Sequence, residues 1–128
     1  MTPRSLLVDD NSRFLSAARE LLEREGLEVV GVASTIAEAT RLVGALDPDV
    51  CLVDIDLGSE SGFELARQIA TGENHSPHVI LISAYPGRDF TDMIAESPAI
   101  GFLSKPELSA ARVRAIVAGH ESGESQPG

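Results

Sequence analysis

Residues Val50–Asp56 read VCLVDID, so that four apolar residues run directly into the carboxylates of Asp54 and Asp56. A strand that is buried on both faces of a sheet has such a continuous apolar pattern. In an open α/β sheet, ligands bind just beyond the carboxyl ends of the strands. The stretch therefore predicts a central strand that ends at a functional site.

The same pattern occurs near the amino terminus, where the apolar run of residues 6–8 precedes Asp9 and Asp10. Around these two runs the chain alternates short apolar stretches with segments of helical periodicity. Strands are expected at 6–9, 29–32, 50–53, 78–82 and 99–103. Helices are expected from about 11 to Gly26, at 36–46, from 61 to before Gly72, at 90–94 and at 108–117. This alternation predicts an α/β fold, a doubly wound, flavodoxin-like parallel sheet of five strands in the order 2-1-3-4-5 with five helices.

Length and composition limit the classes of protein to consider. The 128 residues fit one domain, which we place at 1–119, and the polar residues after Gly119 predict a disordered tail at 120–128. A formal net charge of −10 argues against direct binding of nucleic acid by this chain. No apolar run is long enough to span a membrane and the amino terminus lacks an export signal, so we expect a cytoplasmic protein with no membrane contact. The single cysteine, Cys51, lies in the central strand and is expected to be a buried apolar side chain.

In the predicted strand order, polar side chains from four strand ends meet in one crevice. The six residues are Asp9, Asp10, Asp54, Asp56, Ser83 and Lys105. Carboxylates this close need a compensating cation, and Mg²⁺ prefers oxygen ligands that it shares with a phosphate. A lysine and a hydroxyl suit the remaining phosphoryl oxygens, and a carboxylate can itself be the nucleophile that forms an acyl phosphate. The crevice is therefore expected to hold an aspartyl phosphate.

Simpler structural roles exist for most of these residues. Asp9 and Asp10 are also suited to cap the helix that begins near residue 11. Ser83 fits a turn, and Lys105 fits a solvated position at the end of a strand. Asp54 is harder to explain structurally, because an acid at the end of a core strand is costly unless it has a partner.

Over residues 4–119 the sequence resembles the receiver domain of a two-component response regulator. Asp9-Asp10 resembles the acidic pair of that family, Asp54 its phosphoacceptor, Ser83 its hydroxyl residue and Lys105-Pro106 its Lys-Pro pair, and Gly62 falls where the family commonly has glycine. Many receivers have proline where this chain has Gly58, and tyrosine where it has Phe102.

The resemblance implies a switch that is not an enzyme acting on other molecules but assists its own phosphorylation and dephosphorylation. Asp54 would take a phosphoryl group from a sensor histidine kinase or a histidine phosphotransfer protein, with Lys105 and Ser83 in the reaction. The metal would be Mg²⁺, held at Asp9, Asp10, Asp54 and Asp56, the last through its backbone carbonyl. Phosphorylation would change a surface that binds a downstream protein, and a homodimer is compatible with this role. The chain is expected either to stand alone or to belong to a larger regulator.

Two other functional classes remain open from the sequence. A pseudo-receiver would be an interaction module that never takes phosphate, although the intact acidic, hydroxyl and lysine positions argue against it. The triplet Asp54-Ile55-Asp56 also resembles the nucleophile motif of haloacid-dehalogenase-like phosphatases. Those enzymes carry that motif on their first strand, whereas here it follows the third predicted strand.

Overall fold

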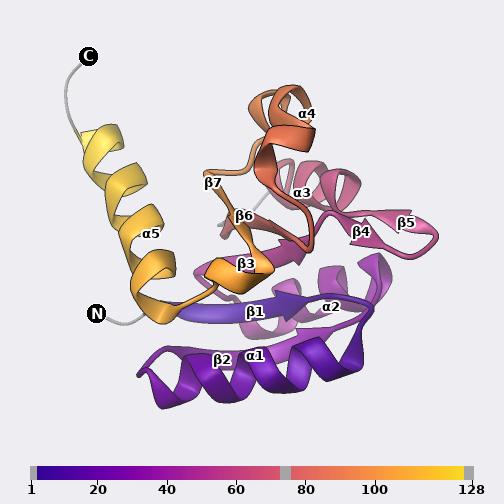
Figure 1. The fold of residues 1–128 in the computed structure, drawn as a ribbon, viewed down its shortest axis with the longest axis vertical. Helices are drawn as coiled ribbons and strands as arrows, with labels where there is room; N and C mark the ends of the chain where they lie inside the picture. Colours follow the sequence, from indigo (N-terminus) through magenta and orange to yellow (C-terminus); the bar gives the residue numbers. More distant parts are fainter. Residues whose placement is uncertain (1–2, 73–75, 126–128) are drawn as a thin grey trace.

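The computed structural model describes residues 3–72 and 76–125, and its main feature is a five-stranded parallel sheet (Figure 1). The strands are β1 (Arg4–Val8), β2 (Glu28–Ala33), β3 (Val50–Asp54), β6 (His78–Ser83) and β7 (Gly101–Ser104). Their spatial order is β2-β1-β3-β6-β7, which confirms the predicted order 2-1-3-4-5 and the flavodoxin-like class.

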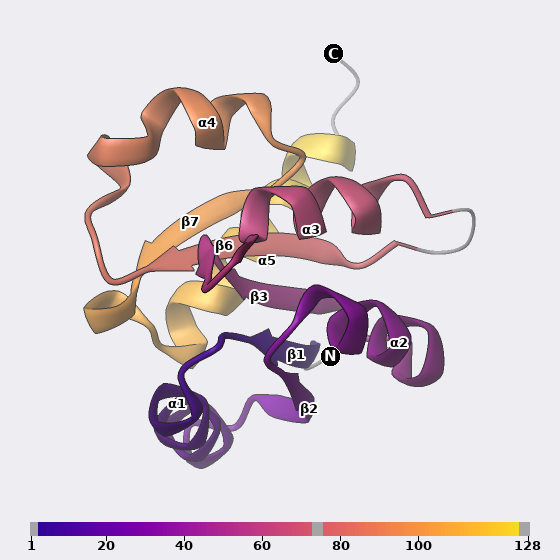
Figure 2. The same ribbon diagram turned by 90° about the vertical axis from the view of Figure 1, so that its right-hand side faces the viewer.

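Five helices cover the two faces of the sheet (Figure 2). They are α1 (Ser12–Arg24), α2 (Ile36–Leu46), α3 (Gly62–Ala70), α4 (Thr91–Glu96) and α5 (Ala110–Ser125). Because successive strand residues point to opposite faces, Leu7 packs with α1 and α5, whereas Leu6 and Val8 pack with α2 and α3. The sheet therefore separates two apolar cores.

Strand β3 lies at the centre of the sheet between β1 and β6. Its first four residues, 50–53, have no exposed surface, as the uninterrupted apolar pattern predicts. Burial also raises the pKa of the Cys51 thiol to about 12. The prediction that this cysteine is a buried apolar side chain is thus confirmed.

Helix α1 begins and ends at residues that the sequence marks, although the first of them differs from the expected cap. The side chain of Asn11 accepts hydrogen bonds from the backbone N–H groups of Arg13 and Phe14, so Asn11 is the N-cap and neither Asp9 nor Asp10 takes that role. After the helix, Gly26 has a φ of +91°, the left-handed conformation expected of a glycine that follows a helix.

A small antiparallel hairpin follows β3, in addition to the strands that the sequence predicted. It consists of β4 (Asp56–Leu57) and β5 (Glu60–Ser61), which pair with each other apart from the main sheet (Figure 1). Gly58 at its tip has a φ of +73°, a backbone conformation that residues other than glycine rarely adopt. The glycine at this position therefore shapes the hairpin.

The segments around β7 differ from the predicted boundaries by small shifts. Two short 3-10 helices, η1 (Gly87–Phe90) and η2 (Lys105–Glu107), precede α4 and follow β7. The short helix predicted at 90–94 is α4 at 91–96, and the strand predicted at 99–103 is β7 at 101–104.

Helix α5 is longer than predicted. It continues to Ser125, so the predicted helix stop at Gly119 is wrong, while 126–128 lie outside the described residues. The domain bounds 1–119 and the disordered tail at 120–128 stay predictions. A glycine inside a helix costs only about 1 kcal/mol relative to alanine, and Gly119 does not adopt a positive φ. The ring of His120 also lies edge-on against that of His78, with 4.9 Å between centroids. The helix therefore crosses the predicted domain boundary.

Across residues 3–72 and 76–125, no helix has both the length and the apolar character needed to cross a bilayer.

Candidate functional site

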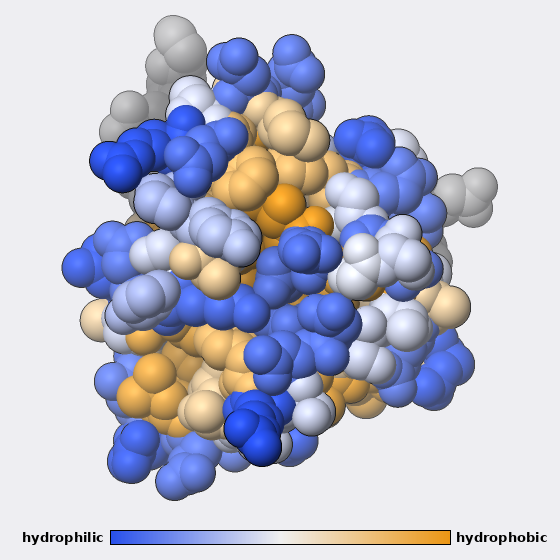
Figure 3. Space-filling model, turned by 45° about the vertical axis from the view of Figure 1, so that its right-hand side comes forward, coloured by the Kyte–Doolittle hydropathy of each residue, from blue (hydrophilic) through white to orange (hydrophobic). Residues whose placement is uncertain are grey.

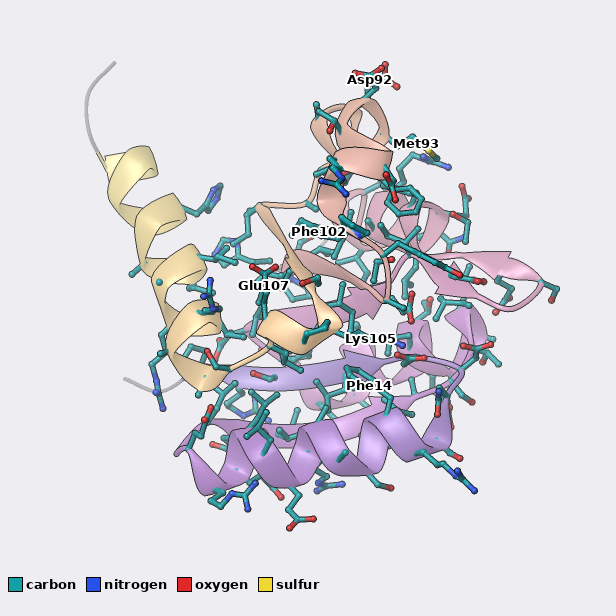
Figure 4. The ribbon with its side chains drawn as sticks, in the orientation of Figure 1. Phe14, Asp92, Met93, Phe102, Lys105 and Glu107 are labelled. Carbon is teal, nitrogen blue, oxygen red and sulfur yellow. The ribbon has the colours of Figure 1, made fainter. Side chains whose placement is uncertain are left out.

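The carboxyl ends of four neighbouring strands bring polar side chains to one edge of the sheet. Asp54 is the last residue of β3 and Ser83 the last of β6, whereas Asp9 and Lys105 directly follow β1 and β7. Figure 4 shows Lys105 at this edge, close to helix α1. The strand order therefore brings these four residues to the same edge of the sheet, as the sequence predicts.

Lys105 joins two of the carboxylates. Its Nζ lies 2.7 Å from Asp9 Oδ2 and 2.9 Å from Asp54 Oδ2. The side chain of Asp9 is fully buried, and those of Asp54 and Lys105 are 7% and 18% exposed. Lys105 is thus not the solvated strand-end residue that the simpler interpretation allowed, but the counter-ion of two buried acids.

Burial and the neighbouring charges act on the pKa values of this group. Burial raises the pKa of Asp9 to about 6, although the contact with Lys105 and a hydrogen bond from the Asn11 backbone N–H, 2.9 Å from Oδ1, act in the opposite direction. The charge of Asp54 acts in the same direction as burial, and the pKa of about 6 is the net result of all these contributions. Burial alone would lower the pKa of Lys105, but its contacts with Asp9 and Asp54 outweigh this and the pKa is raised. Lys105 therefore stays charged near neutral pH.

The backbone around Asp54 fixes the direction of its carboxylate. Asp54 Oδ1 accepts a hydrogen bond from the backbone N–H of Asp56 at 2.8 Å, while Oδ2 faces Lys105. Gly62, at the start of α3, packs directly on the Asp54 carbonyl, because a Cβ at this position would overlap that oxygen. The close approach explains why glycine is needed here.

Asp10 and Asp56 occupy a different environment from Asp9 and Asp54. Both side chains are exposed at the mouth of the cleft. The Asp56 carboxylate accepts a hydrogen bond from the backbone N–H of Gly58 at 3.1 Å, and a Cβ on Gly58 would lie 3.2 Å from Asp10 Oδ2. The four predicted metal-binding residues therefore divide into two buried and two exposed carboxylates.

A cleft of about 450 Å³ opens above this edge. Its lining consists of Asp10, Asn11, Asp54, Ile55, Asp56, Glu60, Ser61, Ser83, Ala84, Tyr85, Phe90 and Lys105. The Ser83 hydroxyl accepts a hydrogen bond from the Tyr85 backbone N–H at 3.0 Å, so Ser83 shapes the turn after β6 and also faces the cleft. Its hydroxyl hydrogen is not used in that bond.

Three residues of this region were missed by the sequence analysis. Tyr85 is 62% exposed beside the cleft. Glu60 turns from the hairpin to α2, where Oε1 accepts a hydrogen bond from the Ile36 backbone N–H at 3.0 Å. Phe14 lies under Lys105, whose Nζ is 4.3 Å from the ring centroid. Phe14 sits in the first helical turn after the acidic pair, and this position was the one available signal of its proximity.

The donor atoms suit a magnesium ion, although the side chains alone form no metal cluster. Among the described residues, no group of three or more His, Cys, Asp and Glu side chains is arranged to hold a metal. Mg²⁺ is usually bound through one or two carboxylates and keeps several waters. Asp10 and Asp54 line the same cleft and supply that number of carboxylates. The site thus fits a partly hydrated ion better than a cage of four carboxylates.

Comparisons with known proteins place the chain in a family. The model of the response regulator receiver domain matches residues 6–118. The transcriptional regulatory protein LiaR of Bacillus subtilis is 32% identical over 114 residues, which cover 88% of this chain and 54% of that protein. PdtaR of Mycobacterium tuberculosis is 28% identical over 125 residues, covering 90% and 60%. The chain thus spans between 54% and 60% of the length of these curated relatives.

Solved structures show the same likeness. A two-component response regulator of the LuxR family from Aurantimonas sp. SI85-9A1 superposes with a TM-score of 0.80 at 30% identity, over 93% of this chain and 87% of that one. The signal receiver domain of the response regulator NarL from Mycobacterium tuberculosis gives 0.77 at 26% identity, over 98% of both chains. Since the family match spans most of the sequence and the fold agrees with it, the chain belongs to the response regulator receiver domain family of two-component signalling.

Proposed function

We propose that Asp54 accepts a phosphoryl group from a sensor histidine kinase or a histidine phosphotransfer protein and thereby switches a protein-binding surface. The observation that carries this proposal is the position of Lys105, whose ammonium touches the carboxylates of Asp9 and Asp54 at the cleft. A nearly buried nucleophile with a fixed cation beside it is what phosphoryl transfer to a carboxylate requires.

In the proposed reaction, an oxygen of the Asp54 carboxylate attacks the phosphorus atom of a phosphohistidine. The new P–O bond gives an acyl phosphate, and the broken P–N bond leaves histidine on the donor. Lys105 is close enough to Asp54 to follow the charge onto a phosphoryl oxygen. The unused hydrogen of the Ser83 hydroxyl is available for a second oxygen.

We propose Mg²⁺ as the metal of this site, held by Asp10 and Asp54, with Asp9 acting mostly through water and the Asp56 carbonyl completing the protein ligands. When bound, the ion supplies positive charge to the phosphoryl oxygens. The exposed positions of Asp10 and Asp56 make this testable, since Asp10→Asn removes a ligating carboxylate and Asp56→Asn leaves the backbone carbonyl in place. Asp10→Asn should weaken Mg²⁺ binding more in a titration, and the reverse order would contradict the assignment.

The output is proposed to depend on Ser83 and Phe102. A phosphoryl group adds a charge of about −1.5 to −2 and three acceptor oxygens, which should draw the Ser83 hydroxyl toward it. Phe102 on β7 is half-buried, and Gly87 gives its ring room, since a Cβ there would lie 2.8 Å from the ring. Met93 on the adjacent α4 is 53% exposed. Figure 3 shows apolar patches between hydrophilic residues on one face of the molecule.

This output is tested by the NMR signals of the Phe102 ring with and without beryllofluoride, a phosphate mimic. A shift in the wild type that is absent in Ser83→Ala is expected. Equal shifts in both proteins would contradict the coupling.

Labelling with acetyl phosphate and Mg²⁺, followed by intact mass, tests the phosphoacceptor. The wild type should gain one phosphoryl group that hydroxylamine removes. Asp54→Asn should remain unlabelled, whereas Asp56→Asn, a matched change two residues away, should still be labelled. Undiminished labelling of Asp54→Asn would refute the assignment.

The same labelling, together with an assay of phosphomonoester hydrolysis, separates the other functional classes. An unlabelled wild type would favour the pseudo-receiver, and repeated turnover of phosphomonoesters would favour a phosphatase. The cytoplasmic location, the absence of direct nucleic-acid binding and the homodimer stay predictions.

A further inference from the structure

The ring of Phe14 forms a third contact for the Lys105 ammonium, in addition to its two carboxylates. Lys105 Nζ lies 4.3 Å from the centre of the ring, within the range of a cation–π interaction. Phe14 is half-buried and packs against the core between the sheet, α1 and α5. The ring therefore sits on a fixed support beside the ammonium.

Two hydrogen bonds tie Phe14 to the same carboxylate that Lys105 contacts. The backbone N–H of Phe14 donates to the Asn11 side chain at 3.1 Å, and the Asn11 backbone N–H donates to Asp9 Oδ1 at 2.9 Å. The start of α1 thus fixes the ring relative to Asp9. Asp9, Phe14 and Lys105 form one connected unit.

We propose that Phe14 is a positioning residue, which holds the Lys105 ammonium between Asp9 and Asp54. A lysine has a long side chain with several rotatable bonds, so its position depends on such contacts. Because the Lys105 side chain is only 18% exposed, the ring acts on a largely desolvated cation, where this interaction is strongest.

This role predicts two effects of opposite sign. The first effect is on phosphoryl transfer, and it rests on the proposed function. Without the ring the ammonium is less ordered and meets the transferred group less often. Removing the ring should therefore slow labelling on the order of 10-fold. Mg²⁺ and the ammonium compete for the same Asp54 carboxylate, so a loosened lysine should strengthen metal binding. A general loss of structure would weaken both.

The test uses Phe14→Leu, which keeps an apolar side chain without an aromatic ring, and Phe14→Tyr, which restores a ring. A third protein carries trifluorophenylalanine at position 14, which keeps the shape of the ring and withdraws electron density from its face. Phe63→Leu is the matched control, since Phe63 is a buried phenylalanine of the other core, and the residues that the structure describes place no cation over its ring.

The first measurement is made on the metal-free, unphosphorylated protein. The Lys105 Hε protons should show an upfield ring-current shift in the wild type, the Phe14→Tyr variant and the Phe63→Leu control, and lose it in Phe14→Leu. A wild-type protein without this shift would overturn the inference, whatever the outcome of labelling. Because this measurement needs only the wild type, it can overturn the inference even if Phe14→Leu fails to fold.

The second measurement compares Mg²⁺ affinity with the rate of labelling by acetyl phosphate. The Phe14→Leu protein and the protein with the fluorinated ring should bind Mg²⁺ more tightly and become labelled more slowly than the wild type. Phe14→Tyr should return both values toward the wild type. In Phe63→Leu, metal affinity and labelling rate should not change in opposite directions. Metal affinity and labelling that fall together in Phe14→Leu, or a fluorinated protein equal to the wild type, would overturn the inference. If the wild-type protein shows the ring-current shift but is never labelled, the proposed function fails and the contact itself stands.

Discussion

Asp9 should make the stability of the protein depend on pH in an uncommon direction. Its side chain is fully buried and its pKa is raised from 3.8 to about 6, so the folded protein favours the protonated form more than the unfolded chain does. Below pH 3.8 both states carry the proton and the contribution of Asp9 is fully present. It is lost as the pH rises toward 6, because the folded protein then has to keep a buried charge.

The size of this effect follows from the shift in pKa. The rise in the pKa of Asp9 from 3.8 to about 6 corresponds to about 3 kcal/mol, which we take as an upper value. Asp9→Asn removes the titration and keeps the shape of the side chain. The difference in unfolding free energy, variant minus wild type, should therefore rise by up to about 3 kcal/mol between pH 4 and pH 7.

Urea unfolding of both proteins at several pH values, with a chelator present to exclude divalent metal, measures this difference. Taking the difference between the two proteins cancels the contribution of distant carboxylates such as Glu64 and Glu107, whose pKa values are lowered by hydrogen bonds from Arg67 and from Ser104. Stability curves that run parallel across this pH range would refute the reasoning. A difference that falls with pH would mean that Lys105 over-compensates the burial of Asp9.

Three further predictions concern single positions. Gly62→Ala should lower the free energy of unfolding in urea by roughly 1–3 kcal/mol, because the added Cβ meets the Asp54 carbonyl. Gly44→Ala in α2, where a Cβ meets nothing within 4 Å, should raise this free energy by up to about 1 kcal/mol. Equal effects of the two substitutions would contradict the close packing at Gly62. Asn11→Ala should cost about 0.5–2 kcal/mol in the same assay through loss of the N-cap, and an unchanged midpoint would show that the cap is dispensable. Cys51 should resist thiol reagents at pH 8 in the native protein and react after unfolding, because burial keeps the thiol protonated; rapid native reaction would contradict this.

The central part of the fold was predictable because its pattern is unambiguous. The apolar run of residues 50–53 indicates full burial, and the acid that ends it indicates a site. The division between buried Asp9 and exposed Asp10 was not predictable, since it depends on where β1 ends. A shift of one residue turns a side chain to the other side. The pairing of Lys105 with Asp9 as well as Asp54 depends on the same detail.

The ends of elements were predicted less well, for physical reasons. Gly119 is compatible with both a helix interior and a helix end, and the contact between His120 and His78 joins residues 42 positions apart, which no local pattern reveals. The contact of Phe14 with Lys105 is likewise long-range. In the sequence Phe14 indicates only the apolar face of a helix.

If Asp54 accepts a phosphoryl group as proposed, the exposed carboxylates at the cleft mouth should also influence which donors reach it. Asp10 and Asp56 face solvent, and the chain as a whole has a formal net charge of −10. A small anionic donor such as acetyl phosphate meets repulsion during its approach, and added salt should speed its labelling by screening over a Debye length of about 8–10 Å. A protein donor whose phosphohistidine lies within a basic surface is instead steered toward the cleft, and salt should slow that reaction. The cleft mouth should therefore select donors by their charge at long range, before any contact forms.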